Sequence, residues 1–380
     1  MTKRVDELLD RARTFSADVV APAAARWDET RTFDTDVLKQ AAGLGLTGIQ
    51  VSGELGGQGR SFSCKARLAE IMAEADFGFA MSLLNTHNVA HKLERGASAA
   101  VAQRYIPDIL SGERLGSTAL TEPQAGSDFA AIRTSASRTS DGWILNGEKA
   151  WIINAAASDV FVLYAQTDSG SGANGIAAFL VDGRRDGFVG RVPFNLTSQS
   201  SIGAGRFALK DYQVLDDEVL QPPGLAFKSA LHEINGARIY VAAMCCGMVA
   251  RCLEIAGEYG RSRVTFGKRL GEHQGWRWAL GDAEVDLAAA RLMVAEASSL
   301  IDEGVDAQFE AARTKIFATR MAEQHLPALA QSMGAEGLRD CYPFGRHQLA
   351  ARIASFTDGS TEMLLERITS RHQKDGQKLS

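Results

Sequence analysis

Apolar positions near the N-terminus recur at intervals of three and four residues, which places their side chains on one face of a helix. They are Val5, Leu8, Leu9, Ala12, Phe15 and Val19. Asp34 and Thr35 offer an N-cap for another helix, which ends near Gly43. Residues 1–115 are therefore predicted to form an N-terminal helical domain.

The pattern changes to short apolar runs between residues 116 and 222. The runs at 158–167, 175–182 and 206–214 have the length and the aromatic and β-branched content typical of strands. Turn signals at 139–142 (Thr-Ser-Asp-Gly) and at Asn146-Gly147 predict two hairpins. Prolines 222 and 223 close the section, because proline cannot donate a ladder hydrogen bond. We expect a small antiparallel β-domain here.

Long helical patterns return from residue 223 to residue 380. The segments 231–260, 272–303 and 305–333 are rich in alanine and apolar on more than one face. Such helices pack as a bundle, and their remaining apolar surface favours contact between subunits. The chain is thus predicted to be α+β, with domains at 1–115 (helical), 116–222 (central antiparallel β) and 223–380 (C-terminal helical bundle).

Composition narrows the class of protein. The 380 residues are 45% hydrophobic and 23% charged, with a formal net charge of −5 and no visible basic stripe, so nucleic acid is not an expected partner. The charged N-terminus does not resemble a secretory signal, and no run approaches the ~18 apolar residues of a membrane helix. Five cysteines without a CxxC pair indicate reduced core thiols and a cytoplasmic location, with a redox role for the Cys245-Cys246 pair as the alternative.

Two short motifs are better explained by structure than by chemistry. Residues 43–48 match GxGxxG, but a helix rather than a strand precedes them, so helix termination is the better interpretation. His87 and His91 have the spacing of metal ligands on a helix, but residue 88 is Asn rather than the Glu of HExxH, and no third ligand is clustered with them. No metal site is expected.

The segment from Thr121 to Asp128 (TEPQAGSD) combines a proline, a glycine and several short hydrogen-bonding side chains. Pro123 fixes one backbone angle and Gly126 permits conformations that other residues avoid. Such a loop can surround a polar ligand with N–H groups and hydroxyls, although an ordinary polar turn has the same composition.

Together with NGEKAWIINA at 146–155, this loop resembles the flavin-binding signature of the acyl-CoA dehydrogenase family. Three further motifs resemble that family in the expected order, RVTFG at 263–267 with Gln274, QSMGAEG at 331–337, and DGSTE at 358–362. The resemblance covers nearly the whole chain. It implies FAD as cofactor, a homotetramer or dimer, an acyl-CoA or acyl-carrier-protein substrate, a role in fatty acid metabolism, and electron-transfer flavoprotein or oxygen as the electron acceptor.

The resemblance also implies roles for individual residues. Ala119, Leu120 and Thr121 would lie along the flavin, and Trp151 would pack on its ring. Ile153 departs from the family, which usually has a hydroxyl there that bonds to flavin N5. The remaining cofactor contacts would be Arg263, Phe266 and Gln274 toward a neighbouring subunit, Gln331, Gly334 and Ala335 on the adenine side, and Ser360 and Glu362. Ser127, Arg238 and Gly359 would contact the substrate.

The implied reaction removes a proton from the α-carbon of a thioester and a hydride from the β-carbon. The family usually has Glu as the base, whereas this chain has Asp358, whose carboxylate sits about 1–1.5 Å further back. Three interpretations stay open: Asp358 is the base, Asp358 is a turn residue, or the base lies elsewhere. A minority of the family carries its base at the position of Ala237, which cannot serve, and Glu233 is a weak candidate one turn earlier.

Nitroalkane oxidases, which belong to the same superfamily, resemble this chain in having aspartate at the matching place. A flavin oxidase of that type is therefore an alternative to the thioester dehydrogenase. A catalytically silent flavin-binding protein is a third hypothesis, which only Ile153 and Asp358 support.

Overall fold

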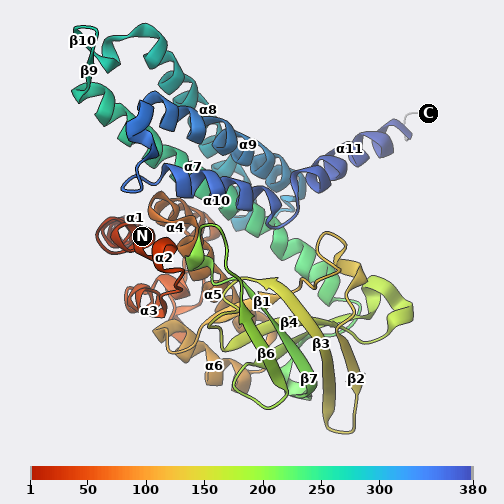
Figure 1. The fold of residues 1–380 in the computed structure, drawn as a ribbon. Coiled ribbons are helices and arrows are strands. Elements are labelled where there is room, and N and C mark those ends of the chain that lie inside the picture. Colours follow the sequence, from red (N-terminus) through yellow and green to blue (C-terminus); the bar gives the residue numbers. More distant parts are fainter. Residues whose placement is uncertain (1, 378–380) are drawn as a thin grey trace. The chain divides into compact units, whose positions relative to one another are not determined.

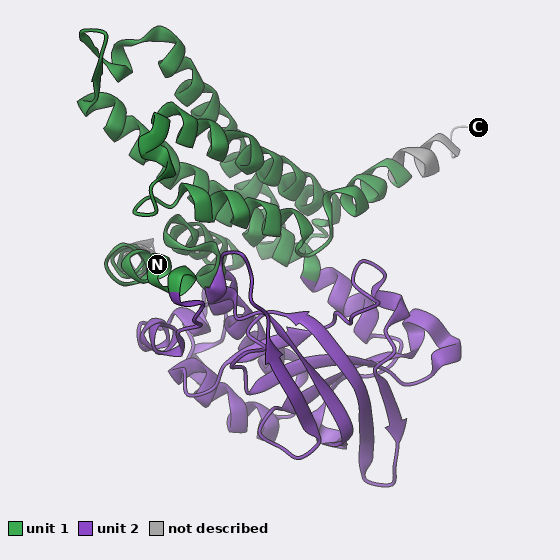
Figure 2. Cartoon of the chain, viewed as in Figure 1, with its two compact units in different colours: residues 1–29, 62–80, 234–380 green, residues 30–61, 81–233 purple. Residues whose placement is uncertain are grey.

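The computed structural model describes residues 2–377, and side chains over residues 7–370. Contacts group the chain into two compact units (Figure 2). Unit 1 comprises residues 1–29, 62–80 and 234–380, and unit 2 comprises residues 30–61 and 81–233. The expected domain boundaries at residues 115 and 222 stay a prediction. The two units are a different division, because each of them joins segments from both sides of these boundaries.

Unit 2 contains a sheet of eight strands in the order β6-β7-β3-β2-β4-β5-β8, with β1 pairing β4 (Figure 1). The strands are β1 (Gly116–Ala119), β2 (Ser135–Arg138), β3 (Gly142–Ile152), β4 (Val160–Gln166), β5 (Ile176–Asp182), β6 (Phe188–Pro193), β7 (Gly205–Leu215) and β8 (Val219–Gln221). Most pairings are antiparallel, as expected. The pairings of β4 with β1 and with β2 are parallel.

Strands β4 and β5 are buried along their whole length, because apolar clusters cover both faces of the sheet there. Alternate residues of β4, such as Val162, face a cluster that includes Leu93 and Ile106. The residues between them, such as Phe161, face a second cluster that includes Phe207 of β7. This double burial explains why the two strands read as nearly continuous apolar runs in the sequence.

Unit 2 also contains α-helices, wholly or for most of their length. They are α3 (Thr35–Gly43), most of α5 (Phe77–Gly96) and α6 (Ala99–Ser111). The predicted cap of α3 is confirmed, since the Asp34 carboxylate accepts the N–H of Asp36 at 3.1 Å. The GxGxxG segment ends this helix, with Gly45 in a left-handed conformation, as the sequence indicated.

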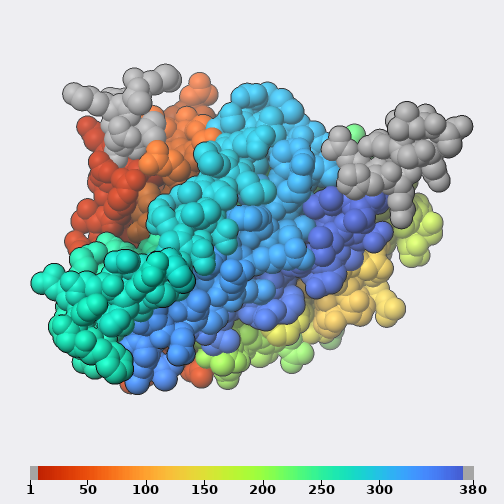
Figure 3. All heavy atoms as spheres, turned by 90° about the horizontal axis from the view of Figure 1, so that it is seen from above, coloured from red at the N-terminus to blue at the C-terminus, as the bar shows by residue number. Residues whose placement is uncertain are grey.

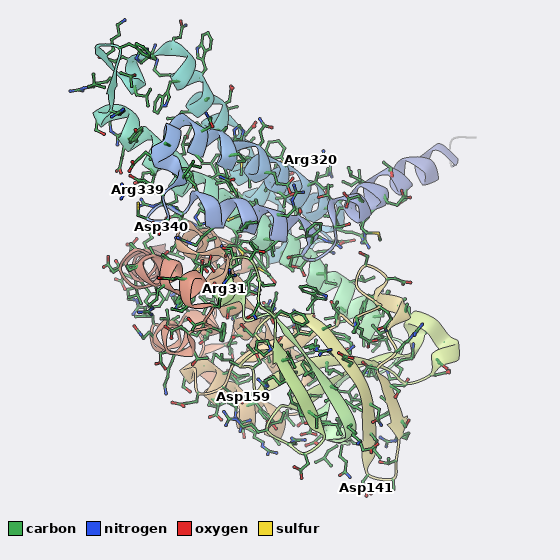
Figure 4. The ribbon with its side chains drawn as sticks, viewed as in Figure 1. Arg31, Asp141, Asp159, Arg320, Arg339 and Asp340 are labelled. Atoms are coloured by element: carbon green, nitrogen blue, oxygen red, sulfur yellow. The ribbon has the colours of Figure 1, made fainter. Side chains whose placement is uncertain are left out.

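One of the two predicted hairpin turns is wrong. The turn at 139–142 exists, with Thr139 N–H donating to the Gly142 carbonyl at 2.9 Å and Asp141 at the tip (Figure 4). Asn146-Gly147 instead lies inside β3 at a bulge opposite β7, where the Asn146 side chain accepts the N–H of Asp211 at 2.8 Å. Glycine is required at 147 because a Cβ there would approach Thr134 to 2.6 Å.

Unit 1 is helical. Its elements are α1 (Thr2–Phe15), the π-helical turn Ser16–Val20, α2 (Ala21–Thr30), α4 (Phe62–Ala75), α7 (Ala226–Ser262), α8 (Gln274–Asp302), α9 (Gln308–Ser332), α10 (Phe344–Phe356) and α11 (Thr361–Gln377), with α2 and α7 extending beyond the unit. A two-stranded hairpin, β9 (Val264–Thr265) and β10 (Lys268–Arg269), joins α7 to α8. The three long helices predicted in this region are confirmed, and α8 and α9 lie side by side (Figure 3).

Helix α7 is the core helix of this bundle. By length and composition it could cross a membrane, but 78% of its most apolar window is buried inside the structure. Its cysteines 245, 246 and 252 are buried, and burial raises the pKa of the Cys245 thiol to about 12. A neutral thiol is a poor nucleophile, so the structure favours the packing role that was expected over the redox alternative.

Candidate active site and cofactor-binding residues

The loop that carries the TEPQAGSD motif is closed by its own backbone. Glu122 N–H donates to the Ala125 carbonyl at 2.9 Å, and Ala125 N–H donates back to Glu122 at 3.1 Å. The loop is also tied to β3, because the Ala150 N–H donates to the Thr121 carbonyl at 3.1 Å. Ser127 lies beyond the closed turn and is exposed, so its hydroxyl can reach a ligand.

A buried ion pair between Glu122 and Lys149 connects this loop to strand β3. Lys149 Nζ lies 2.8 Å from the Glu122 carboxylate, and the two side chains are 1% and 2% exposed. The same ammonium donates to the Leu120 carbonyl at 3.0 Å, which fixes the backbone that is expected along the flavin. Sequence reasoning missed this pair, although two charged residues flanking apolar strands were a visible signal.

The Glu122 carboxylate is fully engaged in the ionised form. Burial alone would raise its pKa, but Lys149 and the backbone N–H of Arg133, which donates at 2.7 Å, lower the pKa to about 2. The N–H of Thr134 donates to the other oxygen at 2.9 Å. Glu122 is therefore an architectural anion and not a candidate base.

Trp151 ends the regular part of β3 and turns outward. The register of β3 shifts between Lys149 and Ile152, and Trp151 adopts a left-handed φ of 59°. Its side chain is 62% exposed, with its ring centroid 4.7 Å from that of Phe194. A core role is thus ruled out, and the exposed ring has the form needed to pack on a planar ligand.

Hydrogen bonds of the residues after Trp151 hold the end of β3 in place. The Ile153 carbonyl accepts the Ser117 hydroxyl at 2.5 Å, while its apolar side chain is half-buried and offers no hydrogen bond. Asn154 is fully buried and donates to the carbonyls of Ser82 at 2.9 Å and Gly116 at 3.2 Å. Sequence reasoning also missed Asn154, which joins α5 and β1 to the strand that carries Trp151.

The residues expected to reach a neighbouring subunit's cofactor are exposed at one end of the bundle in unit 1. Phe266 and Gly267 form the tip of the β9–β10 hairpin, with φ values of 50° and 76°. The Phe266 side chain is 97% exposed, an unusual state for a phenylalanine. Arg263 and Gln274 flank the hairpin and are also exposed.

The adenine-side motif lies at the same end of the bundle. Trp276 of α8 donates its indole N–H to the Ser332 carbonyl of α9 at 2.9 Å, which joins the start of one helix to the end of the other. Gln331 precedes this contact and Gly334 and Ala335 follow it, all three exposed. Arg339, just beyond this motif, is labelled in Figure 4.

The candidate base sits in a tight loop between α10 and α11. Asp358 has a φ of 55° and Gly359 a φ of 101°, so two successive residues leave the usual backbone regions. Aspartate tolerates this conformation better than most residues. Asp358 is half-buried, its carbonyl accepts Arg238 Nε at 3.0 Å, and the Gly359 carbonyl accepts Lys315 Nζ at 2.5 Å.

The other predicted residues near this loop have structural contacts. Ser360 accepts the Met363 N–H at 3.4 Å and so caps α11, and Glu362 is exposed in the first turn of that helix. Arg238 is 5% exposed and also donates to Asn235 at 2.8 Å, while burial lowers its pKa to about 10. The expected substrate contacts of Arg238 and Gly359 stay predictions.

The alternative base positions are weaker. Ala237 is buried and has no titratable group. Glu233 lies 2.7 Å from Lys92 Nζ, so its carboxylate is already engaged in an ion pair. The two histidines that resembled a metal pair are 6.0 Å apart between ring centroids, and His87 contacts the Thr47 carbonyl at 3.0 Å.

Three family models match consecutive segments of the chain. They are the acyl-CoA dehydrogenase N-terminal domain at residues 2–113, the middle domain at residues 117–212 and the C-terminal domain at residues 227–372. The chain belongs to the acyl-CoA dehydrogenase family. Membership confirms the predicted fold class, the class of oxidoreductase acting on CH–CH donors, and FAD as the cofactor.

Individual relatives agree with this assignment. The mitochondrial short-chain specific acyl-CoA dehydrogenase of Homo sapiens is 32% identical over 359 residues, which cover 94% of this chain and 87% of the relative. The solved butyryl-CoA dehydrogenase of Megasphaera elsdenii is 29% identical with a TM-score of 0.92, covering 96% of this chain and 97% of that one. The solved structure of PigA with FAD and proline is 26% identical with a TM-score of 0.91, covering 98% of both chains.

The residues of this acyl-CoA dehydrogenase family member fit FAD. Trp151 presents an exposed aromatic ring for a planar ligand, and Arg263 presents an exposed guanidinium, which suits a pyrophosphate. Gly334, with a φ of 62° and open space around its Cα, lets backbone approach the ligand closely. These features belong to separate parts of the chain, and the roles that their motifs imply for individual residues stay predictions.

Proposed function

We propose that this protein catalyses the FAD-dependent α,β-dehydrogenation of an acyl thioester with Asp358 as the base. The observation that carries the proposal is the loop of Asp358, which is half-buried and held by side chains of two different helices at the place of the family's base motif. Arg238 and Lys315 donate to the backbone carbonyls of this loop and so hold the segment that carries the carboxylate.

Bound FAD supplies the acceptor for the hydride that leaves the β-carbon. The chain must remove the α-proton, which is only weakly acidic, and must therefore hold a carboxylate against the α-carbon while keeping water away. Asp358 supplies that carboxylate. Ala119, Leu120 and Thr121 would lie along the bound flavin, and the exposed ring of Trp151 would pack on it.

The substrate and partners are proposed at the level of chemical class. The names of the human and Megasphaera relatives support a CoA thioester, and a carrier-protein thioester is the alternative. Electron-transfer flavoprotein or oxygen would reoxidise the cofactor. A cytoplasmic location and a role in fatty acid metabolism stay predictions.

A nitroalkane-type flavin oxidase is the second candidate, which the aspartate at position 358 and the isoleucine at 153 favour. Aspartate sets the carboxylate further from the thioester α-carbon than glutamate would, and isoleucine removes a hydroxyl from the expected N5 position. Both differences would be acceptable for a smaller, more acidic substrate.

Anaerobic bleaching of the flavin absorbance separates these functions. The purified yellow protein is mixed with acyl-CoA thioesters of several chain lengths and, separately, with nitroalkanes. We expect bleaching by at least one thioester and reoxidation by an external acceptor. Bleaching by nitroalkanes alone, with peroxide formed in air, would replace the proposal with the oxidase, and no bleaching by any compound would favour the silent flavoprotein.

We also propose that the protein assembles as a homo-oligomer, in keeping with the predicted tetramer. Helix α8 exposes Trp278, Val285 and Leu292, which are 63%, 69% and 73% exposed and spaced by seven residues along one face. Such a stripe is an apolar seam of the kind that packs against another helix.

Leu292→Glu is expected to dissociate the assembly, because it places a charge at the most exposed residue of that seam. Light scattering after gel filtration measures the mass of the assembly, and the flavin absorbance measures its FAD content. If Arg263 and Phe266 reach the FAD of a neighbouring subunit, the FAD content should fall together with the mass. Leu215→Glu, at a 53% exposed site on β7, is the control. A monomeric wild-type protein with full FAD content would refute the assembly.

A further inference from the structure

Lys315 is a buried cation in the first third of α9, with 1% of its surface exposed. Its ammonium donates to the Gly359 carbonyl at 2.5 Å and to the Ser355 carbonyl at 3.4 Å. Burying an ammonium group is costly unless it is hydrogen-bonded or paired. Both acceptors lie at the junction of α10 and the loop of Asp358, so the lysine is directed at this loop.

A second buried cation reaches the preceding peptide from another helix. Arg238 of α7 donates through Nε to the Asp358 carbonyl at 3.0 Å, and its Nη1 is held by Asn235 at 2.8 Å. The carbonyls of Asp358 and Gly359 are therefore each fixed by a separate cation. These two contacts hold the backbone that follows Asp358. Because Lys315 also donates to the Ser355 carbonyl, which precedes Asp358, the loop is held on both sides of this residue, and this restricts the direction of its bond from Cα to Cβ.

The backbone of the loop needs such support. A non-glycine residue in a left-handed conformation is strained, and it persists only where the surrounding structure holds it. The φ of Asp358 is 55°, and that of the next residue is 101°. The side chains of α7 and α9 provide the restraint.

We propose that Lys315 is a positioning residue for the base, which sets the direction of the Asp358 carboxylate through the Gly359 carbonyl. The inference rests on the proposed function, because it assumes that Asp358 takes the α-proton. Lys315 touches neither substrate nor flavin in this role. Lys315 increases the fraction of molecules in which the Asp358 carboxylate points at the reacting carbon.

The charge of Lys315 gives the proposal a pH dependence. Burial is the main reason why the pKa of Lys315 is lowered to about 8, and the charge of Arg238 acts in the same direction. Asp358, Cys245 and, most weakly, Glu362 act in the opposite direction and raise the pKa. A lowered pKa means that the ammonium is present below about pH 8 and is lost above it. The loop should loosen as the pH rises through that value.

Lys315→Met and Lys315→Arg test the proposal in the FAD-loaded protein. In Lys315→Met, the rate constant of anaerobic flavin reduction by the best thioester should fall about 10²-fold, as for a reacting group displaced by ~1 Å. The thioester dissociation constant and the flavin spectrum should change little. In Lys315→Arg the rate should largely recover, and the decline above pH 8 that we expect for the wild type should be absent.

The outcomes separate this proposal from the proposed function. Arg313→Met, which removes an exposed cation two residues away on α9, is the control and should leave the rate unchanged. If Asp358→Asn abolishes reduction while Lys315→Met keeps the wild-type rate, only the positioning role fails. If Asp358→Asn reduces normally, the base assignment fails and takes this inference with it. If Lys315→Met does not fold, a Lys315→Arg variant that keeps the alkaline decline would refute the inference.

Discussion

Asn in place of Asp358 is expected to slow anaerobic flavin reduction by an acyl thioester about 10²- to 10⁴-fold, the range that general-base catalysis contributes. Asparagine has the size of aspartate and adopts left-handed backbone readily, so the φ of 55° and the contacts of the loop should survive. The change therefore removes the proton acceptor and little else. Stopped-flow absorbance of the flavin measures the rate under saturating thioester.

Asp340→Asn is the matched control, because Asp340 is an exposed aspartate of the same unit (Figure 4). It should leave the rate within a factor of two or so, since exposed substitutions rarely perturb a protein by more than about 0.5 kcal/mol. An unchanged rate in Asp358→Asn would remove Asp358 as the base. Glu233 would then have to be reconsidered despite its ion pair with Lys92.

Methionine in place of Lys149 is expected to destabilise the protein by about 3–5 kcal/mol, the effect of leaving one member of a buried ion pair without its partner. The uncompensated charge would be Glu122, which is 3% exposed. The Leu120 carbonyl would also lose its donor, so FAD content should fall together with stability. Urea unfolding followed by fluorescence measures the first effect, and the ratio of flavin to protein absorbance measures the second.

A double variant and a pH series make this prediction specific. Glu122→Leu combined with Lys149→Met should recover part of the lost stability, because it removes both charges. Glu148→Gln, which alters the exposed neighbour in β3, should have little effect. Because the pKa of Glu122 is lowered to about 2 in the folded protein, its contribution should be present above about pH 4.5 and be lost as the pH falls toward 2. A wild-type stability that stays constant over that range would contradict the ion pair.

The sequence was sufficient where a local rule decides the structure. Asp34 caps α3 because a carboxylate before a helical pattern is satisfied by the first N–H groups. Strands β4 and β5 were found because burial on both faces leaves a run of apolar residues. The TEPQAGSD loop was found because the turn residues and the family signature coincide there.

The sequence was insufficient where a distant partner decides the structure. Strand β6 was missed because most of its residues are exposed and it has no apolar run. Asn146-Gly147 became a bulge because Asp211, 65 residues away, binds the asparagine side chain. The support of the base loop by Lys315 joins positions 44 residues apart, and only the packing of the bundle brings them together.

The ion pair of Glu122 and Lys149 affects how the yellow colour of bound FAD should be interpreted when variants of this chain are compared. A screen that counts yellow colonies would rank Lys149 beside Trp151, because loss of either would bleach the protein. The Lys149 side chain is nonetheless 1% exposed and its ammonium donates to Glu122 and Leu120, so it is buried inside the protein and does not face a nucleotide. Loss of colour in a Lys149 variant would therefore indicate that the folded structure is destabilised, not that a contact to FAD is lost. The thermal stability of the flavin-free protein distinguishes residues that stabilise the fold from residues that contact the cofactor.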